Sequence, residues 1–331
     1  MSKNSLSLVF LIGYLLCDFV VSQQLQQYNI DPNSVTVSGL SAGGAMAMQF
    51  HFAHSSEVHG AGIFAGIAYL CASSGLIAAN MCMISPLITN VNNLIAQANN
   101  LAGSSQIDPV GHISGDRVFI FHGVMDFTVV PGAGRHVETM YNHFGAQISS
   151  QFSLPSGHGF PTHNFGGACG STASPFINNC NFRGAYEMLN FLYGGGLTLP
   201  ADTAGVVGNL LNYDQLEFVA GTPNLSSMNA QGFVYVPTAC QQGASCRLHI
   251  SFHGCLQARQ NVGNAYAANA GFMQVAEVNN IIVLFPQVSS IVLTNPNACF
   301  DWWGYLNSNF ATRNGAQIAA TYRMMNRLIR G

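Results

Sequence analysis

A serine surrounded by small residues stands between a strand-like and a helix-like segment near the start of the chain. Residues 35–39, VTVSG, are a short β-branched run, and residues 42–54 place apolar side chains at helical spacing. Ser41 lies between them in GLSAG (residues 39–43), which satisfies G-x-S-x-G. A sharp strand-to-helix turn exposes a serine hydroxyl, and glycines let neighbouring backbone approach it. The feature predicts a nucleophilic Ser41; a glycine- and serine-rich turn without chemistry is the alternative.

Strand and helix signals alternate along the rest of the chain, and residues 197–225 have the weakest pattern, which suggests a loop insertion or lid. Buried strands are predicted at residues 60–69, 117–123, 232–239, 247–254 and 280–287, and helices at 134–144, 184–193, 264–278 and 314–330. Alternation of this kind implies an α/β fold whose mainly parallel sheet carries helices on both faces. Because no repeat or linker separates a second module, we expect a single catalytic domain over residues 23–331.

Charged residues are unusually scarce. Only 7% of the 331 residues are charged, 49% are hydrophobic, and the net charge is −3. This excludes a nucleic-acid binder that works through a basic patch and a polybasic membrane-surface protein. A membrane protein or a secreted protein with a neutral polar surface remains.

The N-terminus favours secretion. Lys3 precedes an apolar run at residues 8–17, and residues 20–22 (VVS) suit a cleavage site. The run is too short for a comfortable membrane span. We therefore expect a signal peptide at residues 1–22, an extracellular protein, and no integral membrane span in the mature chain; a retained anchor is the alternative.

The cysteines agree with an oxidising compartment. Of nine cysteines, Cys17 falls in the predicted signal peptide, which leaves an even number for disulfides. Proximity suggests the pairs 71–82, 169–180 and 240–246, which leaves 255 with 299. None has zinc-ligand spacing, so we expect neither a metal nor a cofactor. The sequence Asn224-Leu225-Ser226 is an acceptor for an N-glycan at Asn224.

A nucleophilic serine needs a base and an acid that orients the base. Asp126 follows the strand at residues 117–123, where the acid of such a triad would lie; a turn or helix cap is the alternative. His158 lies in a glycine-flanked loop, SGHGFPT. His163, five residues later, is its main rival, and spacing alone does not decide between the two.

The transition state needs two amides that stabilise the oxyanion. One normally follows the nucleophile, here Ala42, and the other follows a strand that comes earlier in the chain. No such strand fits before Ser41, but a His-Gly-Cys turn at residues 253–255 follows a buried strand. This predicts the amide of Cys255 as the second donor; a tight turn held by a disulfide is the alternative.

The order of these segments predicts a permuted chain. The terminal helix at residues 316–328 resembles the one that usually precedes the nucleophile strand. Joining Arg330 to about Gln26 would restore the usual order of helix, strand and nucleophile turn. We therefore expect a circularly permuted α/β-hydrolase fold.

The chain resembles a known family, the extracellular poly(3-hydroxybutyrate) depolymerases, specifically the single-domain, circularly permuted fungal type. The resemblance runs over residues 30–328 and is carried by IDPNSVTVSGLSAGG, FAGIAYLC, HGVMDFTV, GHGFPT, GFVYVPTAC, LHISFHGCLQ, NNIIVLFPQ and NPNACFDWWGY. It implies Ser41 as nucleophile, Asp126 as acid and His158 as base. It also implies the amides of Ala42 and Cys255 as oxyanion donors.

The resemblance further implies that an aromatic side chain from DWWGY stacks in a polymer cleft. The chain has two tryptophans, Trp302 and Trp303, both in this segment. Paired tryptophans often divide between core and rim, so one can be purely structural, and we favour Trp303 as the substrate contact.

Together these features predict a secreted serine esterase that hydrolyses poly(3-hydroxybutyrate) or a related hydroxyalkanoate polyester. Its partner is then a polyester or a small ester, and no nucleic acid. Two alternatives remain: another secreted carboxylesterase of the feruloyl or acetyl-xylan type, and a non-catalytic binding protein on the same scaffold.

Overall fold

The structure is a computed structural model that describes residues 23–202, 205–221 and 226–331. The predicted signal peptide at residues 1–22 and the predicted glycan acceptor Asn224 lie outside the described residues.

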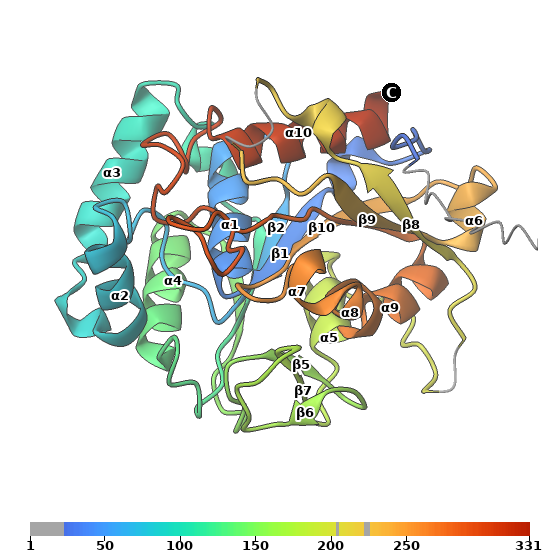
Figure 1. The fold of residues 1–331 in the computed structure, drawn as a ribbon, viewed down its shortest axis with the longest axis horizontal. Helices are drawn as coiled ribbons and strands as arrows, with labels where there is room; N and C mark the ends of the chain where they lie inside the picture. The colour runs from blue at the N-terminus through green and yellow to red at the C-terminus, as the bar shows by residue number, and fades with distance from the viewer. Residues whose placement is uncertain (1–22, 203–204, 222–225) are drawn as a thin grey trace, which may run out of the picture.

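An eight-stranded sheet forms the centre of the molecule (Figure 1). Its strand order is β4-β3-β2-β1-β10-β11-β9-β8, parallel throughout except that β9 runs antiparallel to both β11 and β8. The strands are β1 (Thr36–Leu40), β2 (Gly60–Phe64), β3 (Arg117–Phe121), β4 (Gln147–Gln151), β8 (Asn209–Asp214), β9 (Gln231–Val236), β10 (Arg247–Phe252) and β11 (Ile281–Phe285). The mainly parallel sheet predicted from the sequence is confirmed.

Helices cover both faces of this sheet (Figure 1). The helices are α1 (Ala42–Ala53), α2 (Leu76–Ile84), α3 (Val91–Gly103), α4 (Pro131–His143), α5 (Gly184–Leu192), α6 (Thr238–Gln241), α7 (Arg259–Val262), α8 (Ala265–Asn269), α9 (Phe272–Asn279) and α10 (Ala316–Arg330), with 3-10 turns η1 (Pro32–Ser34), η2 (Pro86–Ile88), η3 (Val110–Ile113) and η4 (Leu216–Phe218). Helices α1, α3, α4 and α10 share one apolar core with the sheet, and α5, α8 and α9 share another. Because both faces are covered, the central strands β1, β2 and β11 are buried along their whole length.

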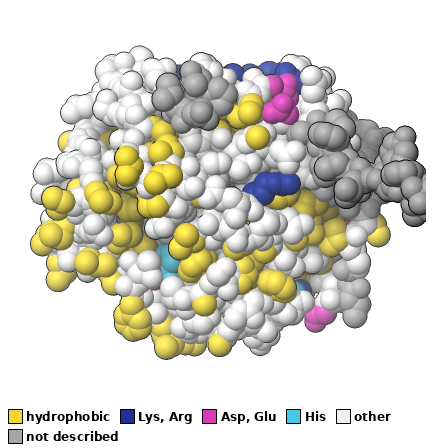
Figure 2. Space-filling model, viewed as in Figure 1, with side chains coloured by type: hydrophobic (Ala, Val, Ile, Leu, Met, Phe, Trp, Pro, Cys, Tyr) yellow, Lys and Arg dark blue, Asp and Glu magenta, His cyan; other side chains and the backbone are white. Residues whose placement is uncertain are grey.

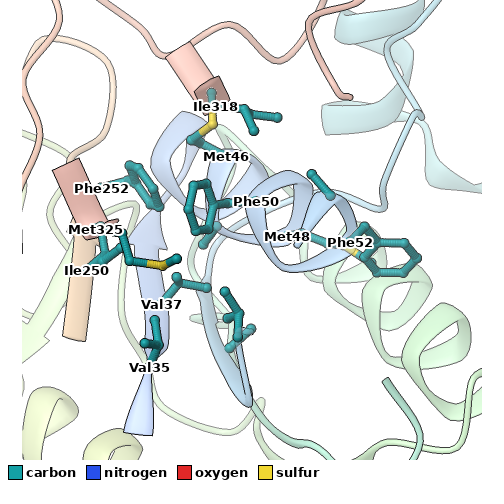
Figure 3. Packing of buried hydrophobic residues seen from close by; sticks show 14 of the residues in the cluster. Val35, Val37, Met46, Met48, Phe50, Phe52, Ile250, Phe252, Ile318 and Met325 are labelled. Carbon is teal, nitrogen blue, oxygen red and sulfur yellow. The ribbon is translucent and has the colours of Figure 1, made fainter. Parts of the chain in front are cut away.

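Helix α1 is held between the sheet and the C-terminal helix (Figure 3). Met46 and Phe50 on α1 belong to the same buried cluster as Val37 on β1 and Met325 on α10. All four side chains are fully buried. The helix that begins directly after Ser41 is therefore fixed by packing on two sides.

The strand order confirms the circular permutation. Strand β10 pairs directly with β1, with Thr36 opposite His249, although the two residues are far apart in the chain. The two ends of the described fold meet, because the amide of Tyr28 donates to the carbonyl of Leu328 at 2.9 Å. A joined chain would thus run from α10 into β1, as in the unpermuted fold.

Some expectations were wrong in detail. Residues 197–225 contain the edge strand β8, so the segment is not simply a loop insertion or lid. The strand predicted at 60–69 ends at Phe64, because Ala65 turns the backbone to φ 46°. The helix predicted at 264–278 is two helices, since Gly271 has φ 86°. A small sheet of β5 (Phe160–Thr162), β6 (Gly167–Ala168) and β7 (Ile177–Asn179) was not predicted.

All four disulfides expected from the sequence, three by proximity and one by elimination, are present. They join Cys71–Cys82, Cys169–Cys180, Cys240–Cys246 and Cys255–Cys299. Disulfides of this number are typical of proteins that fold in an oxidising compartment. Within the described residues, no helix has the length and apolar character needed to cross a bilayer.

Candidate active site

Ser41 occupies a strained turn between β1 and α1. Its φ of 57° and ψ of −119° lie outside the regions that non-glycine residues usually adopt. Its amide donates to the carbonyl of Phe64 at 2.8 Å, which helps to hold the turn against β2. The side chain is partly exposed. This is the geometry of a serine presented at the carboxyl end of a central strand.

The glycines on both sides of Ser41 are required by close backbone contacts. A Cβ atom on Gly43 would lie 2.1 Å from the carbonyl oxygen of Phe252, and one on Gly39 would lie 2.2 Å from that of Gly43. Both distances are far below van der Waals contact. The glycines therefore let β1, α1 and the end of β10 approach one another around the serine.

Asp126 and His158 form a buried pair. The Oδ2 atom of Asp126 lies 2.7 Å from Nδ1 of His158, and its Oδ1 accepts hydrogen bonds from the amides of Thr128 and Val129, both at 2.9 Å. The amide of His158 donates to Thr172 Oγ1 at 3.0 Å, which fixes the loop. With Nδ1 engaged by the carboxylate, Nε2 is the ring atom left to exchange a proton with a substrate or nucleophile.

The structure separates His158 from its rival. His163 Nε2 contacts Asp202 at 3.0 Å, away from Asp126. His122 lies 4.0 Å from Asp126, but its Nε2 is 2.8 Å from the carbonyl of Val129, and burial lowers its pKa to about 4. Of the three histidines, His158 is the one whose ring is hydrogen-bonded to Asp126.

A second serine–histidine contact lies beneath the turn. Ser38 Oγ is 2.7 Å from His249 Nε2, and Thr36 Oγ1 is 2.8 Å from His249 Nδ1. Both ring nitrogens thus contact hydroxyl groups rather than a carboxylate, and burial lowers the pKa of His249 to about 3. Both Ser38 and His249 are fully buried within the sheet. The pair therefore joins β1 to β10 and is closed to substrate.

An apolar cleft of about 320 Å³ brings the predicted residues together. Ser41, His158, Cys255, Trp302 and Trp303 all line it. The rest of the wall is mostly apolar and includes Leu76, Ala79, Met83, Phe176 and Leu256. Such a cleft suits a neutral substrate that has few polar groups. None of these five wall residues was predicted, because apolar side chains in a low-charge sequence give no signal of their own.

Two amides at the cleft are free to donate. Ala42 is the first residue of α1, where backbone amides have no acceptor within the helix. Cys255 follows the turn after β10, and a Cβ atom placed on Gly254 would lie 3.5 Å from Ser41 Cβ, so this turn lies against the serine. Within the described residues, neither Ala42 nor Cys255 donates its amide to another protein group.

The two tryptophans have different surroundings. Trp302 is buried among Ala42, Ala45 and Ile67, and no described residue accepts a hydrogen bond from its Nε1. Trp303 is half-buried, and its ring centroid lies 5.3 Å from that of Trp302. Trp302 thus forms a wall of the cleft, and Trp303 lies nearer its rim.

Asp301 organises the segment that carries both tryptophans. Its carboxylate accepts hydrogen bonds from the amides of Gly304, Tyr305 and Leu306. Burial outweighs these contacts and raises its pKa to about 6. It is a turn residue, and the carboxylate that contacts His158 is that of Asp126.

Among the described residues, no cluster of three or more His, Cys, Asp or Glu side chains could hold a metal ion.

No protein-family model matches the chain, but curated proteins and solved structures do. The chain is 36% identical over 318 residues to a poly(3-hydroxybutyrate) depolymerase of Delftia acidovorans and spans 62% of that protein's length. It is 34% identical over 331 residues to a polyhydroxybutyrate depolymerase of Talaromyces funiculosus, with 94% of each chain covered.

Solved structures give the same result. The crystal structure of PHB depolymerase from Penicillium funiculosum matches with a TM-score of 0.85 and 31% identity, over 93% of this chain and 99% of that one. A PHB depolymerase complexed with an R3HB trimer matches equally well. The chain belongs to the poly(3-hydroxybutyrate) depolymerase family.

Proposed function

We propose that this protein is a secreted serine esterase that hydrolyses poly(3-hydroxybutyrate) or a related hydroxyalkanoate polyester. The observation that carries the proposal is the 2.7 Å contact between Asp126 and His158, in a cleft that Ser41 also lines. The relatives are named as depolymerases of this polymer, and one solved relative holds an R3HB trimer.

The reaction follows from the roles of the three side chains. His158 Nε2 takes the proton of Ser41 Oγ as that oxygen attacks the ester carbonyl, and Asp126 stabilises the imidazolium that forms. The amides of Ala42 and Cys255 stabilise the tetrahedral oxyanion, and each such donor contributes about 3 kcal/mol to catalysis. The alcohol leaves with the proton from His158, and water, activated by the same imidazole, then releases the acid from Ser41.

An exposed apolar surface next to the cleft supports a polymeric substrate. We name it the α2 patch; it consists of Leu76, Ile77, Ile84, Leu87 and Ile88, all more than half exposed. Hydrophobic side chains gather over α2 on the face shown in Figure 2, and no charged residue occurs between Glu57 and Asp108. An uncharged apolar surface adsorbs to a neutral polyester at little desolvation cost. Leu76 also lines the cleft, so the patch continues into it.

Secretion is part of the same proposal. Four disulfides suit an extracellular enzyme, and an extracellular enzyme can reach a solid polymer that cannot enter a cell. N-terminal sequencing of the protein recovered from culture medium should begin near Gln23.

Two variants and one control variant test the catalytic assignment. Ser41→Ala and His158→Ala should each lower the turnover of a soluble butyrate ester by at least about 1,000-fold, because both belong to one proton-transfer unit. His163→Ala, in the neighbouring loop, should retain wild-type turnover. An organophosphonate should label Ser41 in the wild type; absence of label together with absence of turnover would favour a binding protein.

A substrate panel tests the polyester assignment. The enzyme should cleave ester bonds in poly(3-hydroxybutyrate) film faster than it cleaves feruloyl or acetyl-xylan esters. A preference for either of those esters, with the film left intact, would identify a different carboxylesterase on the same scaffold.

A further inference from the structure

The peptide group between Gly254 and Cys255 is held from its far side. In a trans peptide the carbonyl and the amide of the unit point in opposite directions within one plane. The direction of the Gly254 carbonyl therefore fixes the direction of the Cys255 amide. If this peptide flipped, a carbonyl oxygen would replace the amide at the cleft and repel a developing oxyanion.

His253 holds that carbonyl. Its Nδ1 lies 2.8 Å from the carbonyl oxygen of Gly254, and its Nε2 accepts a hydrogen bond from the amide of Val288 at 3.3 Å. Since Nε2 is the acceptor, the proton is on Nδ1 and is donated to Gly254. The fully buried ring packs against Phe300, with centroids 4.8 Å apart. Burial lowers the pKa of His253 to about 4, so the ring stays neutral and keeps this tautomer at neutral pH.

Gln257 holds the preceding amide. Its Oε1 accepts a hydrogen bond from the amide of Gly254 at 2.8 Å. Its Nε2 donates to the carbonyls of Pro175 and Phe176 at 2.9 and 3.1 Å, in a segment that also lines the cleft. The side chain is buried, so these bonds have no competition from solvent. Gln257 thus joins the turn after β10 to the segment of Pro175 and Phe176.

The disulfide at Cys255 does not supply this orientation. It joins the side chain of Cys255 to Cys299 and makes no bond to the carbonyl or the amide of the Gly254–Cys255 peptide. His253 bonds to the carbonyl oxygen that would have to move in a rotation of this peptide. Gln257 bonds to the amide of Gly254, which precedes the rotating peptide, and so anchors the residue from which the rotation would start.

We propose that His253 and Gln257 are positioning residues that hold the Gly254–Cys255 peptide with its amide directed at the oxyanion of the reacting ester. This inference rests on the proposed esterase function. The charge that the amide meets develops in the transition state, so loss of the orientation should lower kcat far more than it raises KM.

The test uses variants that remove or restore the bond to Gly254. His253→Leu, which has no donor, should lower kcat for a soluble butyrate ester about 100-fold while KM changes less than threefold. His253→Asn places an amide nitrogen near the position of Nδ1 and should restore most of the loss. Gln257→Leu should lower kcat about 10-fold, and Gln260→Leu, an exposed neighbour on α7, should change neither parameter.

Two further readouts separate orientation from damage to the fold. The extent of organophosphonate labelling of Ser41 at completion gives the fraction of protein with an intact active site. The value of kcat is then expressed per labelled site. The affinity of a boronic acid that forms a tetrahedral adduct with Ser41 should fall in parallel with kcat, because that adduct carries the oxyanion charge.

Unchanged kcat per labelled site in His253→Leu and Gln257→Leu would overturn the inference, as would an equal loss in His253→Asn and His253→Leu. If His253→Leu does not fold, the comparison of Gln257→Leu with Gln260→Leu decides. Failure of the proposed function itself would appear separately, as wild-type turnover in Ser41→Ala.

Discussion

Ser41 adopts a positive φ in a turn that is possible because Gly39 and Gly43 have no Cβ atoms to clash with the surrounding backbone. A Cβ atom on Gly43 would lie 2.1 Å from the carbonyl oxygen of Phe252 and 2.5 Å from the carbonyl oxygen of His253. Two strands and a helix therefore converge on this glycine, and the position of the nucleophile depends on a side chain being absent.

Gly43→Ala should consequently disrupt the turn. A methyl group there forces α1 away from β10, so we expect a loss of at least about 2 kcal/mol in the free energy of unfolding and a drop in turnover of more than about 10-fold. Gly103→Ala is the control, because a Cβ atom there meets nothing within 4 Å. Urea unfolding and ester turnover measure both effects; equal stability of the two variants would contradict this account.

The candidate residues differ in how far their sequence context could predict them. Ser41 was predictable because its motif has a steric cause that appears in the sequence as glycines. His158 and His163 could not be separated by spacing, since the choice depends on which loop reaches Asp126 in space. Gln257 could not be predicted at all, because it acts on backbone atoms and such contacts leave no sequence pattern.

At the scale of elements, the strands at the centre of the sheet were predicted and its edge was not. Strands β1, β10 and β11 are buried almost throughout because both their faces are covered. Strand β8 at the edge reads NLLNYD, and asparagine and aspartate are depleted in strands, so the segment lacked a strand signal. Pairing with β9 supplies what local propensity does not.

Helix α2 and the turn η2 carry the α2 patch, which gives a prediction for adsorption. The triple variant Ile77→Ser, Leu87→Ser and Ile88→Ser should bind poly(3-hydroxybutyrate) film at least about 10-fold more weakly, because roughly 1 kcal/mol of apolar burial is lost per side chain. Turnover of a soluble butyrate ester should be unchanged, since none of the three lines the cleft.

Val207→Ser, next to β8 at the opposite edge of the sheet, is the matched control for exposed apolar surface. Film binding by the triple variant at the wild-type level would show that another face adsorbs.

Across the whole molecule, buried histidines link stability to pH. Burial lowers the pKa of His54, His122 and His253 to about 4 and that of His249 to about 3. Between about pH 6.5 and 4 the unfolded chain binds protons that the folded chain does not, so the free energy of unfolding falls as the pH falls. Asp301, with its pKa raised to about 6, opposes this trend by one proton.

These five groups give a net slope of about 4 kcal/mol per pH unit near pH 5, from about three protons. His54→Phe preserves the ring that stacks on Tyr322 at a centroid distance of 4.1 Å. It should reduce the slope by one proton, about 1.4 kcal/mol per pH unit, in denaturant unfolding measured from pH 4.5 to 7. A slope equal to that of the wild type would show that His54 titrates normally in the folded protein.

The pairing of β1 with β10 also determines when the centre of the sheet can form during biosynthesis. A chain made from its N-terminus releases β1 early, and β2 can join it at once, but the partner that lies opposite Thr36 is at His249. Until most of the chain has been translated, the middle of the future sheet has an open edge of unpaired peptide groups. Long-range pairing of this kind is slow and exposes the nascent chain to aggregation. The permuted order thus places the demand for chaperone protection on the very strand that leads to the nucleophile.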